Sequence, residues 1–163
     1  MDVKKEMLEA RAQLYERSKV AETVDAYKGI LARAEAAGAP ADDITICIAS
    51  IAMVSHELNQ LDDAIAFYGR ALQQPLHATL RAEVLQNKAI AHLAAHHYDE
   101  AVRVCEQALS AAYNTSNLLL IAGLEANLGT MREAAQSRPD KIIVIGVGEK
   151  NDGRSLITRV EEN

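Results

Sequence analysis

Three clustered histidines are the residues of this 163-residue sequence that most invite a search for chemistry. His92 and His96 are four residues apart, so on a helix they would share one face and could bind one metal ion, with His97 beside them. No carboxylate or cysteine nearby completes a ligand set. We therefore predict no metal site, and instead a packed His92 followed by a turn at His96 and His97.

Other residue types with catalytic potential are also present but not arranged for catalysis. Asp62, Asp63, Asp99 and Glu100 open predicted helices, where negative charge interacts favourably with the helix dipole. Nothing in the spacing brings Ser, His and Asp together as a nucleophilic triad. The two glycines of residues 146–148 lack the third glycine and the following helix of a dinucleotide-binding loop. We expect a protein that is not an enzyme and binds no cofactor.

Charge and composition narrow the class of partner. The net charge is −6 and no basic block occurs, which argues against nucleic-acid binding. The first residues lead into an amphipathic stretch, unlike a signal peptide or a membrane span, so we expect a cytoplasmic protein that does not bind membranes. Cys47 and Cys105 stand alone among apolar neighbours, which predicts reduced core thiols.

The elements that position these residues are predicted to be helices. Apolar residues make up 49% of the chain, Trp is absent, and each of the three prolines follows a helical apolar period. Gly38, Asn59, His96 and Gly129 are predicted breaks, and Thr115 a helix cap. The periodicity predicts eight helices, at residues 3–17, 20–37, 43–58, 61–74, 77–95, 98–113, 115–128 and 130–137. The expected fold class is all-α, with one helical domain over residues 1–140.

The helix pairs repeat along the chain. Residues 64–72 align with residues 101–109 at an offset of 37, and a shortened third copy starts at Met131. Small residues recur at matching places: Ala52, Ala89 and Ala122 would let the helices of a pair approach closely. An antiparallel array of similar helix pairs is therefore expected.

These residues resemble the tetratricopeptide repeat (TPR) family, in which a large apolar residue, Leu-Gly-x-x-Tyr and Ala-x-x-x-Phe precede a terminal proline. The matching residues are Ile48, Ile51, Ala52, Ser55, Ala64, Tyr68 and Ala71, then Leu85, Ala89, His92, Tyr98, Ala101, Cys105 and Ala108, then Leu118, Ile121, Ala122, Gly129, Met131 and Ala134. The resemblance is best over residues 42–138 and implies about three to four repeats in a TPR-like α-solenoid.

The resemblance also implies a binding groove on the concave side, lined by the first helix of each repeat. Carried onto this sequence, the groove residues with the strongest case are Met53, Asn87, Ile90, Leu119 and Leu120. This set is mostly apolar, so the implied ligand is an apolar helix or an extended apolar segment of a protein. The alternative is that the chain's own flanking helices cover these side chains.

Residues 141–163 change character. A β-branched run over residues 141–147, turn residues at 149–153 and a second strand over residues 155–160 predict a β-hairpin. Ile142, Val144 and Ile145 are too apolar to stay exposed, which makes them a candidate docking strand. The hairpin could cap the last helices, fill the groove, or pair with a partner or a second copy.

The sequence therefore predicts a non-catalytic adaptor or chaperone-like module for a protein partner. The alternative is a structural subunit or self-assembling homo-oligomeric scaffold that docks through residues 141–163.

Overall fold

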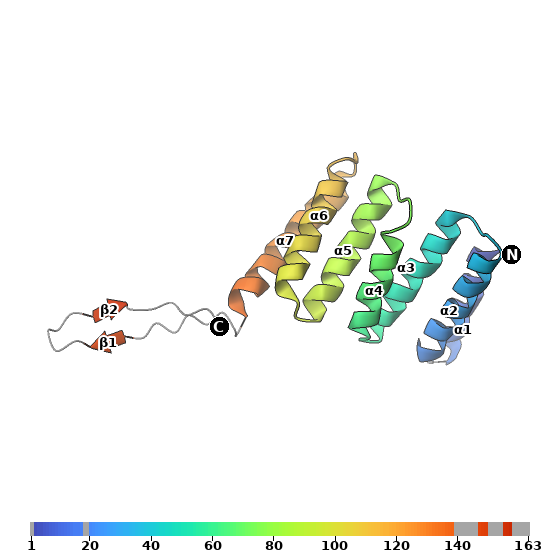
Figure 1. Cartoon of the computed structure of the whole chain (residues 1–163), viewed down its shortest axis with the longest axis horizontal. Coiled ribbons are helices and arrows are strands. Elements are labelled where there is room, and N and C mark those ends of the chain that lie inside the picture. The colour runs from blue at the N-terminus through green and yellow to red at the C-terminus, as the bar shows by residue number, and fades with distance from the viewer. Residues whose placement is uncertain (1, 18–19, 139–146, 150–154, 158–163) are drawn as a thin grey trace.

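The computed structural model describes residues 2–17, 20–138, 147–149 and 155–157 (Figure 1). Residues 2–138, as far as they are described, are all-helical, and this confirms the predicted helical class. The helices are α1 (Val3–Arg17), α2 (Val20–Ala36), α3 (Ala41–Glu57), α4 (Leu61–Ala71), α5 (Ala78–Ala94), α6 (Tyr98–Ala112) and α7 (Leu118–Ser137).

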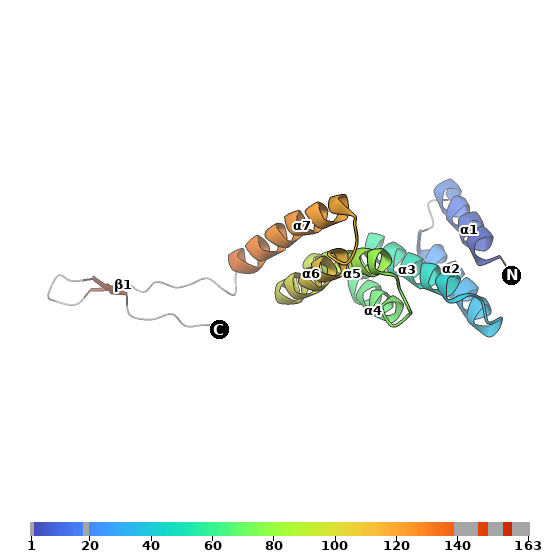
Figure 2. The same ribbon diagram turned by 90° about the horizontal axis from the view of Figure 1, so that it is seen from above.

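Consecutive helices stand side by side in a row that runs from α1 to α7, each packed on the next (Figure 1). In the view from above, α1 and α7 lie on one side of the row and α4 on the other (Figure 2). Short links between the helices force this antiparallel order, because a link of a few residues cannot carry the chain to a distant helix.

Small side chains let these helices approach closely. Ala52, Ala64, Ala89 and Ala101 are fully buried where the repeat pattern expects them, and Tyr68 is buried with the first two of these. The core has two clusters, one mainly from α1 to α4 and one from α5 to α7. Cys47 and Cys105 are free and buried in these clusters, as predicted.

The turn inside a helix pair is repeated with nearly the same backbone geometry. Asn59 and His96, which are 37 residues apart, both have left-handed φ angles, of 58° and 61°. After α3, the Gln60 amide donates to the Ser55 carbonyl at 2.8 Å, and after α5 the His97 amide donates to the His92 carbonyl at 2.9 Å. These are Schellman caps, which satisfy carbonyls that a helix end leaves free. The sequence repeat is thus also a repeat of structure.

The last helix differs from prediction. α7 runs without a break through Gly129, where we expected two helices, so no fourth helix pair forms in the described residues. Gly129 lowers helix propensity but does not end the helix, since Leu124, Leu128 and Met131 continue one buried stripe past it. The same register leaves Ala122 exposed, so its predicted packing role was wrong.

The start of α7 also differs. Thr115, the predicted cap, lies in the preceding turn, where its hydroxyl donates to the Ala112 carbonyl at 2.6 Å. The cap is Asn117, whose side-chain oxygen accepts from the Leu120 amide at 3.0 Å.

Near the C-terminus, β1 (Val147–Glu149) pairs with the antiparallel β2 (Ser155–Ile157). Glu149, expected in the turn, is the last residue of β1 and lies opposite Ser155. Two strands of three residues do not by themselves make a stable hairpin unit. The candidate docking strand of Ile142, Val144 and Ile145 lies outside the described residues, as does the predicted boundary at residue 140. Both stay predictions.

Candidate functional site

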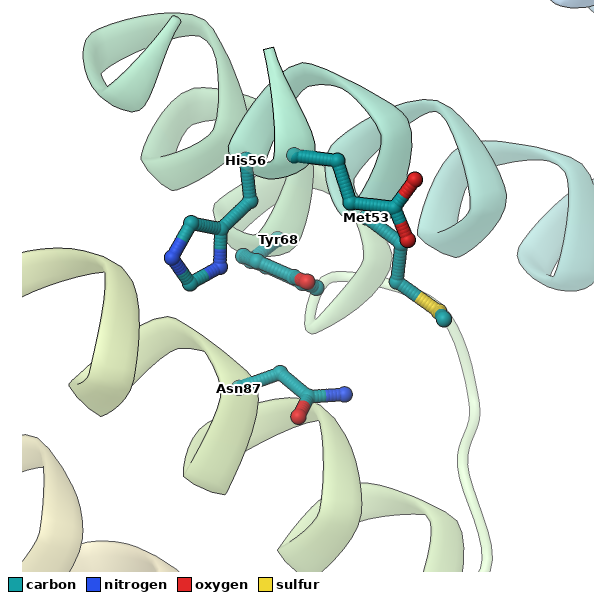
Figure 3. A pocket seen from close by; sticks show the side chains of 5 residues that line it. Met53, His56, Tyr68 and Asn87 are labelled. Atoms are coloured by element: carbon teal, nitrogen blue, oxygen red, sulfur yellow. The ribbon is translucent and has the colours of Figure 1, made fainter. Parts of the chain in front are cut away.

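An open depression lies between α3, α4 and α5, with a volume of about 340 Å³ (Figure 3). The side chains that line it are Met53, His56, Glu57, Tyr68 and Asn87. It lies at the boundary between the two repeated helix pairs, because α3 and α4 form one pair and α5 begins the next.

Helix geometry explains why these side chains meet. Met53, His56 and Glu57 are three and four residues apart, so they share the face of α3 opposite its buried face. Tyr68 comes from α4 and is only 1% exposed. Figure 3 shows the Tyr68 ring between His56 and Met53, with Asn87 on the facing helix α5. The depression therefore has the buried Tyr68 ring at its base, with Met53, His56 and Glu57 on the α3 side and Asn87 on the α5 side.

The Tyr68 hydroxyl keeps its proton at neutral pH. Burial, and secondly the negative charge of Glu57, raise the pKa of Tyr68 to about 12. Across the described residues, the side chains of His56, Glu57 and Asn87 form no hydrogen bond or ion pair with another residue. Their polar atoms are thus available to a ligand.

The predicted groove residues fall into three places. Met53 is 43% exposed and lines the depression together with Asn87. Ile90 and Leu120 are half-buried against the core cluster of α5 to α7, so flanking helices partly cover them. Leu119 is 88% exposed in the first turn of α7. Of the five predicted groove residues, the structure brings two together in the depression, Met53 and Asn87.

Sequence reasoning missed Glu57 and Tyr68 as site residues. Tyr68 matched a packing position of the repeat, and it does pack, but it also forms the floor of the depression. Glu57 is four residues after Met53, and that spacing was the available signal that it shares the Met53 face.

A second exposed apolar feature, the α7 patch, consists of Tyr113, Leu118 and Leu119. The Tyr113 hydroxyl donates to a carboxylate oxygen of Glu125 at 3.0 Å, which holds the ring against α7. Leu118 and Glu125 are about two turns apart, on one face of α7.

The histidine cluster is a packing feature at the end of α5. His92 is 9% exposed and its Nδ1 atom has no hydrogen-bond partner, while the His92 and His97 rings lie 5.7 Å apart. Burial, and then the positive charges of Lys88 and His97, lower the pKa of His92. His96 lies in the turn after α5, and its Nδ1 is 2.8 Å from the Tyr98 hydroxyl. In the part of the chain that is described, no three His, Cys, Asp or Glu residues form a metal-binding group.

Comparison with known proteins places the fold but not the activity. No protein-family model matches this chain, and no curated protein matches it. The chain is similar to the crystal structure of BtubC (BKLC) from P. vanneervenii, with a TM-score of 0.67 and 23% identity. The similarity covers 76% of this chain and 53% of that chain, so this chain spans about half the length of its structural relative. This likeness shows a common fold. Within the described residues, no helix has both the length and the hydropathy of a membrane span.

Proposed function

We propose that this chain is a non-catalytic, TPR-like protein-binding module that acts as an adaptor or chaperone-like protein. Its ligand is an apolar helix or extended segment, bound across the exposed faces of α3, α5 and the start of α7. The observation that carries the proposal is the open depression between two structurally repeated helix pairs, with the exposed thioether of Met53 at its rim.

The repeated geometry supports the TPR assignment. The positions that the family fills with small or packed residues are buried in both pairs, including Ala52 and Ala89, and the turns at Asn59 and His96 match. An array of this kind leaves one face of its first helices exposed to bind other chains. The buried, free thiols of Cys47 and Cys105 fit the cytoplasmic location that we expect.

A peptide library displayed on phage and selected on the intact chain tests this function. Selected peptides should be rich in apolar residues, and Met53→Lys should weaken their binding about tenfold or more, because it puts a charge into an apolar contact. Gln107→Lys adds the same charge at an exposed position of α6, outside the depression, and should leave binding unchanged. Peptides that bind the Met53→Lys protein as tightly as the wild type would refute the proposal.

A second function is favoured by the α7 patch. Leu118 and Leu119 are large apolar side chains that solvent reaches almost fully, at a helix with no following helix in the described residues. A structural subunit or homo-oligomer could cover them, with residues 141–163 as a further docking segment. Sedimentation velocity separates the two functions. A concentration-dependent oligomer that is lost on Leu119→Asp or on removal of residues 141–163 favours assembly, and a monomer at all concentrations rules out self-assembly.

A further inference from the structure

We propose that the depression between α3 and α5 binds a cationic side chain, the guanidinium or ammonium group of an arginine or lysine in the bound protein segment. This inference rests on the proposed function and adds a charged contact to a groove that the sequence alone presents as apolar.

The polar groups around the depression are all able to accept hydrogen bonds. The Glu57 carboxylate only accepts, the Asn87 amide and the Tyr68 phenol each have an oxygen acceptor, and a neutral His56 ring has one acceptor nitrogen. Among the described residues, no lysine or arginine lines the depression. The nearby Lys88 instead extends toward α4, with its Nζ 3.7 Å from where a Gly69 Cβ would stand. A ligand group with several N–H donors and a positive charge complements this set.

The Glu57 carboxylate is the charge that selects a cation. Some other acidic side chains of the helical array are ion-paired: Glu6 pairs with Arg33, and Glu106 pairs with Arg132. Glu57 has no such partner in the described part of the chain, although it lies close enough to Tyr68 to raise the pKa of that phenol. An unpaired, exposed carboxylate at the edge of the depression can attract a cation and accept charge-assisted hydrogen bonds from it.

The apolar part of the lining distinguishes a side chain from a simple inorganic cation. Arginine and lysine carry an aliphatic stem below their charged group, and such stems pack along apolar surface. Met53, which is 43% exposed, supplies that surface on the same depression as Glu57 and Asn87. A volume of about 340 Å³ is large enough for one such side chain.

Methionine methyl NMR tests the proposal directly, with the intact chain labelled on its methionine methyl groups. Met53 is the reporter, because it is exposed while Met7 and Met131 are buried. The probe is Nα-acetyl-arginine amide, and its matched neutral control is Nα-acetyl-citrulline amide. The Met53 signal should shift saturably as the arginine probe is added. The protein should bind the citrulline probe at least about fivefold more weakly, because the charge-assisted hydrogen bonds are lost.

Two variants place the effect on Glu57. Glu57→Gln should weaken the arginine probe about fivefold or more, whereas Glu133→Gln, which removes one exposed carboxylate from α7, should not. Equal affinity for the two probes, or an unchanged affinity of Glu57→Gln, overturns the inference. The phage-selected peptides distinguish the two proposals. If they bind Glu57→Gln as they bind the wild type but fail on Met53→Lys, the cation pocket is wrong and the proposed function stands. If they also bind Met53→Lys normally, the proposed function itself fails.

Discussion

Replacement of Gly129 by alanine should stabilise the protein, and the sign of this effect decides whether α7 is one helix or two. In the structure Gly129 is exposed in the interior of α7, and a Cβ atom added there would meet no other atom within 4 Å. Glycine costs a helix interior about 1 kcal/mol relative to alanine. Gly129→Ala should therefore raise the free energy of unfolding by about 1 kcal/mol and the Tm by about 2–4 °C.

Gly38→Ala provides the opposite case. Gly38 ends α2 with a φ of +62°, and its added Cβ would also stand in open space. Gly38→Ala should therefore lower the free energy of unfolding by about 1 kcal/mol, and only because alanine disfavours a positive φ. If Gly129 ended a helix in the same way, its replacement would destabilise the protein as Gly38→Ala does.

Urea unfolding followed by circular dichroism measures the free energy of unfolding of both variants. Hydrogen exchange of the α7 amides adds a local reading, because a terminal helix of a repeat array can open before the rest. A lower urea midpoint for Gly129→Ala, or faster exchange in α7, would refute the continuous helix.

Three further results are expected. Burial lowers the pKa of His92 below its ordinary value of 6.5 in the folded protein. As the pH falls below 6.5, the unfolded chain therefore binds more protons at this residue than the folded chain does. The contribution of His92 to the free energy of unfolding is thus complete above pH 6.5 and is lost as the pH falls. His92→Phe should therefore flatten the fall of the urea midpoint between pH 7 and pH 5, and an unchanged pH dependence in this variant would contradict the prediction. Burial, then Glu35, raises the pKa of Cys47 to about 11, so a thiol reagent at pH 8 should modify it only in urea. His96→Gly should raise the urea midpoint more than Asn59→Gly, since asparagine tolerates positive φ better than histidine.

Sequence periodicity predicts the helices of this chain well where the end of the buried stripe coincides with helix-terminating residues. The first helix was predicted with the bounds that α1 has, Val3 to Arg17. The predicted helix that starts at Leu61 ends early, at Ala71, because the Gln73 amide bonds back only three residues, to the Arg70 carbonyl. Such a tighter last turn leaves no mark in apolar spacing.

The errors at α7 have a common cause. Glycine and threonine are signals of a helix end only when packing does not override them, and at Gly129 the buried stripe continues. Thr115 and Asn117 are both good caps by residue type, and only the three-dimensional turn decides between them.

The candidate site was partly accessible to sequence reasoning. Met53 and Asn87 follow from the repeat register, since each is an outward position of a first helix. Glu57 shares a face of α3 with Met53 four residues earlier, so its place could have been read from the sequence. The contribution of Tyr68 depends on how α4 packs against α3 and α5, which hydrophobic periodicity does not encode.

The left-handed residues Asn59 and His96 send the chain out of one helix and into the next along the same path. Each stretch of 37 residues therefore presents to its successor an end of the same shape. Duplication or deletion of one such stretch in a gene would lengthen or shorten the protein without leaving a mismatched junction. The number of copies, more than the sequence of any single copy, would then decide how long the row of helices is.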